Sequence, residues 1–101
     1  MKLSKLLGEI EYTCIQGEIE VEISSLVYDS RKAGPGCVFV CMTGARSDGH
    51  DYIEEVAARG AAAVVIQKDV SIPEGLTVIR TADTRLALAC MSAAYFGHPA
   101  R

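Results

Sequence analysis

Two loops of this sequence concentrate side chains that suit the binding of a small anion. The first, residues 28–32, reads Tyr-Asp-Ser-Arg-Lys and follows an apolar stretch. The second, residues 43–51, reads Thr-Gly-Ala-Arg-Ser-Asp-Gly-His-Asp and lies between a buried-strand pattern and an amphipathic helix pattern. Each loop carries a serine hydroxyl and an arginine fork suited to phosphate, and Gly44 and Gly49 allow a ligand close to the backbone. Because strand ends and helix N-termini converge at such loops, we expect both to face one small anionic ligand.

The same residues also have purely structural interpretations. Asp29 suits a turn cap, because an aspartate side chain accepts a hydrogen bond from the backbone two residues on. Residues 48–51 are typical of a helix entry, where His50 is more often a structural hydrogen-bonding residue than a catalytic base. Residues 34–36, Gly-Pro-Gly, are typical of a tight turn rather than of a phosphate cradle. Spacing alone leaves the binding and structural interpretations open.

The elements that position the loops alternate between strands and helices. Strict charged–apolar alternation over residues 18–23 predicts a strand with one wet and one buried face. The unbroken apolar run of residues 37–42 predicts a central strand buried on both faces. Shorter elements are predicted at residues 2–9 (helix) and at 12–15, 26–28, 61–66 and 76–79 (strands). The chain is therefore expected to form a small α/β fold with a single sheet flanked by helices.

Two longer helices complete the expected fold. Asp51 is a good N-cap for the first, Glu54 completes a capping pair, and Gly60 is a plausible stop. The second, residues 83–96, is apolar almost all round, so it should be buried on more than one side. In so small a domain, we expect one of those sides to be covered by something outside this chain.

Length and composition limit the function classes. The chain has 101 residues, 50% of them hydrophobic, and a formal net charge of −3, which favours one packed domain, residues 1–101. No apolar run approaches the roughly 20 residues that cross a bilayer. Basic residues are outnumbered and dispersed, so neither nucleic acid nor a membrane surface is an expected partner.

The four cysteines are interpreted as free, buried thiols, which favours a cytoplasmic protein. They are Cys14, Cys37, Cys41 and Cys90. On the predicted strand Cys37 and Cys41 lie roughly 13 Å apart, whereas a disulfide needs Cα atoms within about 7 Å. The sequence has neither a CxxC pair nor a Cys/His cluster, so no metal site is expected.

Familiar catalytic patterns are missing from the sequence. It contains no GxxxxGK[ST] phosphate loop, no GxGxxG, no HExxH and no GxSxG. No catalytic residue is therefore expected in this chain. The residues alone indicate an α/β domain that binds a nucleotide or phosphate.

A series of short motifs resembles the N-terminal domain of the Mur ligases. Residues 28–31 are similar to the family's Asp-Ser-Arg segment, and residues 34–40 to its Pro-Gly turn and following strand. Residues 48–53, Asp-Gly-His-Asp-Tyr-Ile, and 57–65 continue the succession in the family's order. The resemblance covers about residues 20–101, and it departs from the family pattern at Cys37 and at residues 45–47.

The resemblance implies a site for the uridine-diphosphate end of a nucleotide-linked substrate. The positions that it assigns to nucleotide contact are Tyr28, Ser30, Ala45, Arg46 and Ser47. The positions that it assigns to shaping the loops are Asp29, Arg31, Asp48, Gly49 and His50.

The reaction implied for the intact parent is ATP-dependent amide formation in peptidoglycan-precursor synthesis. UDP-N-acetylmuramoyl-L-alanyl-D-glutamate, a diamino acid and ATP give the tripeptide, ADP and phosphate, with magnesium at the phosphates. ATP and magnesium belong to a central ATPase domain that is absent from this chain, as is the C-terminal domain. This chain alone is expected to show no turnover.

Two alternatives share much of this pattern. One is the same domain of the D-alanyl-D-alanine-adding Mur ligase, opposed mainly by the segment Gly97-His98-Pro99. The other is a free-standing interaction module whose last apolar helix docks onto a partner protein. A GxxGK[ST] motif in the reading frame soon after Arg101 favours the ligase, and a stop codon there favours the module.

Overall fold

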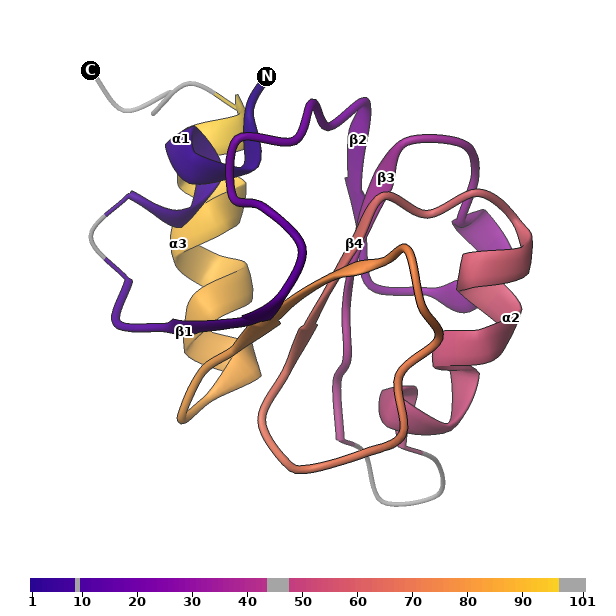
Figure 1. Cartoon of the computed structure of the whole chain (residues 1–101). Helices are drawn as coiled ribbons and strands as arrows, with labels where there is room; N and C mark the ends of the chain where they lie inside the picture. The colour runs from indigo at the N-terminus through magenta and orange to yellow at the C-terminus, as the bar shows by residue number, and fades with distance from the viewer. Residues whose placement is uncertain (9, 44–47, 97–101) are drawn as a thin grey trace.

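A five-stranded mixed sheet forms the centre of the computed structural model, which describes residues 1–8, 10–43 and 48–96. The strand order is β1-β5-β4-β3-β2; β1 is antiparallel to β5, and all other pairs are parallel. The strands are β1 (Thr13–Gln16), β2 (Ser25–Val27), β3 (Cys37–Val40), β4 (Ala63–Ile66) and β5 (Thr77–Arg80). Helices flank the sheet (Figure 1), which confirms the predicted α/β fold.

Strands β3 and β4 are interior strands with every residue buried. Their apolar side chains alternate between two cores: Val38 and Val40 pack on one face of the sheet, and Phe39 packs on the other. A strand covered on both faces needs no polar side, which explains its unbroken apolar run. The prediction of a buried interior strand from residue 37 is confirmed.

Three helices supply the covering layers. Helices α1 (Leu3–Leu7) and α3 (Thr84–Phe96) pack on the face that carries Val38 and Val40. Helix α2 (Ile53–Ala58) packs on the opposite face through Ile53 and Val56. Figure 1 shows α1 beside α3 on one side of the sheet and α2 on the other. In the described part of the chain, no helix is long and apolar enough to cross a membrane.

The predicted strand at residues 18–23 is wrong. This segment runs beside the start of the chain: the Leu3 N–H donates to the Val21 carbonyl at 2.9 Å, and the Ile23 N–H donates to the Met1 carbonyl at 2.7 Å. Ile19 and Val21 still pack against the core, and Ile23 is buried. The alternation therefore correctly marked one buried face, but the partner is the start of α1 rather than a strand of the sheet.

The second helix begins differently from the prediction. A 3₁₀ turn, η2 (Gly49–Tyr52), precedes α2, and the Asp48 carboxylate caps it by accepting from the His50 N–H at 3.0 Å. Asp51 is therefore not an N-cap: it lies inside η2, which Asp48 caps, and the N-cap position of α2 is Tyr52. The predicted stop is confirmed: Gly60 has a φ of 98°, and a Cβ there would lie 3.0 Å from the Pro35 Cα.

Helix α3 is less buried than its composition predicted. Thr84, Ala87 and Met91 are buried against the sheet and α1, whereas Leu86 is 62% exposed and Phe96 is 68% exposed. The described residues thus cover one side of this apolar helix and leave apolar side chains on its other side exposed. That something beyond this chain covers the rest remains a prediction.

The cysteines divide into two pairs of different exposure. All four are free thiols, as predicted, but only Cys37 and Cys41 are buried, and Cys14 and Cys90 are exposed. Burial raises the pKa of the Cys41 thiol to about 12, so this sulfur stays protonated and packs as an apolar group.

The orientation of α3 can be checked with a matched pair of substitutions. Met91→Ala removes a side chain with no exposed surface and should lower the free energy of unfolding by about 2–5 kcal/mol. Leu86→Ala, on the exposed side of the same helix, should change it by less than about 0.5 kcal/mol. Urea unfolding followed by circular dichroism measures both values. Equal losses would show that α3 packs differently.

Candidate functional site

A hollow of about 670 Å³ opens where the first loop and both ends of the second loop meet. Tyr28 to Arg31 follow β2, Met42 and Thr43 follow β3, and Gly49 begins the turn before α2. Because β2 and β3 are parallel, their carboxyl ends lie at the same edge of the sheet, which brings these loops together. The hollow is therefore shared by the two segments that the sequence singled out.

The first loop is held by a close ion pair within it. Asp29 Oδ1 accepts from the Arg31 N–H at 2.9 Å and from Arg31 Nε at 3.1 Å, while Oδ2 accepts from Nη2 at 2.9 Å. The Arg31 guanidinium holds the pKa of the Asp29 carboxyl at about 2. Asp29 thus caps the 3₁₀ turn η1 (Ser30–Lys32), as its structural interpretation proposed. This pairing offsets the charge of Arg31, while the ring of Tyr28 stays exposed beside the hollow.

The second loop is described only at its two ends. Thr43 and Asp48 pair across its base, and the Gly49 N–H donates to the Met42 carbonyl at 2.7 Å. A Cβ on Gly49 would lie 2.7 Å from the Met42 backbone nitrogen, so the close approach of these strands requires glycine. Ala45, Arg46 and Ser47 lie outside the described residues, and their assignment to nucleotide contact stays a prediction.

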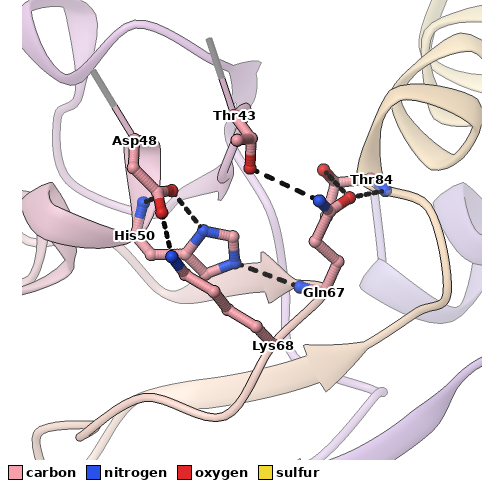
Figure 2. A network of polar contacts seen from close by, with 6 residues as sticks. All are labelled: Thr43, Asp48, His50, Gln67, Lys68 and Thr84. Carbon is pink, nitrogen blue, oxygen red and sulfur yellow. Dashed lines mark hydrogen bonds and ion pairs between the residues drawn. The ribbon is translucent and has the colours of Figure 1, made fainter. Parts of the chain in front are cut away.

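A polar network braces the far end of this loop (Figure 2). The His50 ring is almost fully buried; its Nδ1 lies 2.6 Å from Asp48 Oδ1, and its Nε2 accepts from the Gln67 N–H at 3.1 Å. Because Nε2 accepts, the ring proton sits on Nδ1 and is donated to Asp48. With both nitrogens engaged, His50 serves as a structural brace and has no free nitrogen for acid–base chemistry.

The Asp48 carboxylate is the charged centre of this network. Burial acts to raise its pKa, but hydrogen bonds from Lys68, from the His50 backbone and from the His50 ring outweigh burial and lower that pKa well below its usual value. Lys68 forms an ion pair with the other carboxylate oxygen. Asp48 is therefore ionised at neutral pH, and its carboxylate contacts His50 and Lys68.

Gln67 is a part of the site that the sequence did not reveal. It follows β4, and its side-chain Oε1 accepts from both the backbone N–H and the hydroxyl of Thr84 at 2.9 Å. Its Nε2 donates to Thr43 Oγ1 at 3.3 Å, so one amide joins the second loop to the start of α3. Its place directly after a buried strand, as in both loops, is the signal that could have found it.

Arg85 is the second residue that was missed. It lies in the first turn of α3 and lines the hollow opposite the residues of the first loop and Thr43. Sequence spacing gave no reason to group it with loops more than thirty residues earlier. Only the path of α3 past the ends of the parallel strands brings it there.

The charge on Asp48 should make stability depend on pH. Asp48→Asn removes the ion pair with Lys68 and weakens the acceptor of His50, which should cost about 1–3 kcal/mol at pH 7. Because folding depresses the pKa, this contribution is present above the ordinary carboxyl pKa of about 4 and is lost as the pH falls further. Urea unfolding of both proteins between pH 7 and pH 3 measures the difference. Asp51→Asn, an exposed control, should change little, and a difference that grows on acidification would contradict the assignment.

The contacts of the Gln67 side chain with Thr84 and with Thr43 can be tested separately. Gln67→Leu leaves the buried Thr84 N–H and hydroxyl without an acceptor and should cost about 1–3 kcal/mol of unfolding free energy. Thr43→Val removes only the exposed end and should cost less than about 0.5 kcal/mol. Thermal and urea unfolding provide the comparison. A Gln67→Leu protein as stable as the unchanged chain would rule out the bridge.

Comparison with known proteins identifies the family and agrees with the fold. The sequence pattern of the "Mur ligase family, catalytic domain" matches residues 22–96. The UDP-N-acetylmuramoyl-L-alanyl-D-glutamate–2,6-diaminopimelate ligase of Clostridium perfringens is 42% identical over 99 residues, which are 98% of this chain and 20% of that protein. Its counterpart in Alkaliphilus metalliredigens is 39% identical over 101 residues, 100% of this chain and 20% of that protein.

Solved structures give the same result at lower identity. The UDP-N-acetylmuramoylalanyl-D-glutamyl-2,6-diaminopimelate–D-alanyl-D-alanyl ligase from Acinetobacter baumannii superimposes with a TM-score of 0.78 and 26% identity, covering 92% of this chain and 21% of that one. The chain thus spans about a fifth of the length of its relatives. Since the family pattern covers most of its length, this chain belongs to the Mur ligase family, as an N-terminal domain similar to that of the 2,6-diaminopimelate ligases.

Proposed function

We propose that this domain holds the uridine-diphosphate end of a UDP-N-acetylmuramoyl-dipeptide within a ligase of peptidoglycan-precursor synthesis. The observation that carries the proposal is the shared hollow, which brings the first loop, the base of the second loop and the start of α3 to one edge of the sheet. The relatives' names supply the substrate class, because those proteins act on UDP-N-acetylmuramoyl-L-alanyl-D-glutamate.

The chemistry of the hollow supports a nucleotide. The exposed Tyr28 ring can stack on a base, because every base presents a π-face to an aromatic side chain. The Ser30 hydroxyl can donate to or accept from the sugar or base, and the Gly49 backbone can be approached closely. Ala45, Arg46 and Ser47 lie outside the described residues, and we keep them as proposed nucleotide contacts on the resemblance alone.

The proposed role of the domain in the parent enzyme is that of an anchor. Binding energy at the nucleotide end holds the distant carboxylate where it reacts, although the anchor touches no reacting atom. The sequence of this chain contains no GxxxxGK[ST] phosphate loop. We assign ATP, magnesium and amide formation to the rest of the parent, in the bacterial cytoplasm, and expect no turnover from this chain alone.

The D-alanyl-D-alanine-adding ligase is the second candidate parent. The solved neighbours of that type share the fold at 26% identity, whereas the 2,6-diaminopimelate ligases share 36–43% across nearly the whole chain. Sequence similarity therefore favours the diamino-acid-adding parent. The exposed apolar side of α3 is the observation that favours a protein-interaction role instead.

Titration of the ¹⁵N-labelled chain with UDP tests the proposal. We expect amide shifts at Tyr28–Arg31, Thr43 and Gly49, and none along α1, because only the former line the hollow. Ser30→Ala should weaken UDP binding by about 3- to 10-fold through the loss of one hydrogen bond, while Ser4→Ala on α1 should not. Shifts confined to α1, or no UDP binding at all, would contradict the proposal.

A further inference from the structure

The charged side chains that line the hollow do not contribute equally to its potential. They are Asp29, Arg31, Glu55 and Arg85. Arg31 is paired with Asp29, and Glu55 lies 3.6 Å from the Arg59 guanidinium on the next turn of α2. Within the described residues, Arg85 takes part in no ion pair. Of the described charged side chains that line the hollow, Arg85 is therefore the one that no ion pair neutralises.

The backbone N–H groups at the start of α3 are not free to attract an anion in place of the Arg85 side chain. The Thr84 N–H donates to Gln67 Oε1, and the N–H groups of Arg85 and Leu86 donate to Asp83 Oδ1 at 2.9 and 3.2 Å. These amides, which at other helices bind anions, already have side-chain acceptors. Attraction for an anion at this wall of the hollow must come from the Arg85 side chain.

The base of Arg85 is fixed on both sides. Its own N–H is held by Asp83, and Thr84 before it is buried and held twice by the Gln67 amide. The same amide donates to Thr43, which lines the hollow, so Arg85 and the second loop are set relative to one another (Figure 2 shows the Thr43–Gln67–Thr84 link). A guanidinium on a fixed backbone loses less freedom when it binds than one on a mobile loop.

We propose that Arg85 is the residue of this hollow that binds the diphosphate of the nucleotide, and that Gln67 positions it. The inference rests on the proposed function and adds to it the residue that distinguishes a nucleoside diphosphate from a nucleoside. A guanidinium fork can bind phosphate oxygens through two parallel hydrogen bonds, which an ammonium cannot do. Arg31 is less suited to this role, because its Nε and Nη2 already donate to the Asp29 carboxylate, which offsets its charge.

Comparison of UDP with uridine as probes tests Arg85 directly. In Arg85→Gln we expect UDP to bind about tenfold more weakly, while uridine binds as it does to the unchanged chain. Arg85→Lys should fall between the two, since it keeps the charge and loses the fork. Arg80→Gln is the matched control: it removes the same charge from a pair with Asp69 outside the hollow and should leave both affinities unchanged.

The results of these titrations distinguish a failure of the Arg85 inference from a failure of the proposed function. Equal UDP affinity in Arg85→Gln and the unchanged chain would overturn the role of Arg85 alone. Equal loss of UDP and uridine would also overturn it, because the residue would then act on the nucleoside or on the fold. Absence of UDP binding by the unchanged chain would overturn the proposed function and this inference with it.

Discussion

The parallel pairing of four strands is the constraint on which the rest of this structure depends. Strands β2, β3, β4 and β5 run in the same direction, so their carboxyl ends meet at one edge. Tyr28, Thr43 and Gln67 each follow one of these ends, and α3 begins just after β5. The buried apolar side chains of β3 and β4 fix this arrangement from both faces. Packing in the cores therefore decides which polar residues become neighbours.

Polar contacts then fix the loops that packing has brought together. His50 is buried, yet each ring nitrogen has a partner, so its burial leaves no unmet hydrogen bond. Gln67 uses its backbone and both ends of its side chain and thereby connects η2, the second loop and α3. Because the polar groups of this network are paired with one another, losing one hydrogen bond leaves another buried group without a partner. The network therefore favours one arrangement of these side chains. The described ends of the second loop are consequently held by hydrogen bonds to Gln67 and within the Asp48–His50 pair.

Local patterns in the sequence were reliable where one segment determines the outcome. The apolar runs gave β3 and β4, the glycine at residue 60 marked the end of α2, and the first loop was placed correctly after β2. Residues 18–23 failed because alternation identifies a buried face without identifying its partner, here the chain start. Gln67 and Arg85 were missed because their role arises from contacts between distant segments. The exposure of Cys14 and Cys90 likewise depends on which faces other elements cover.

Ion pairing decides which charges the hollow presents in a domain with a net charge of −3. Among the described residues, its acidic groups are paired locally, Asp29 with Arg31 and Glu55 with Arg59, and Arg85 is the lining cation without an ion pair. An exposed cation contributes little free energy alone, since water screens it. If the proposed function holds, affinity for the nucleotide must come from several modest contacts acting at fixed distances. This explains why so much of the described structure goes into holding the loops and the start of α3 in place, and so little into the contacts themselves.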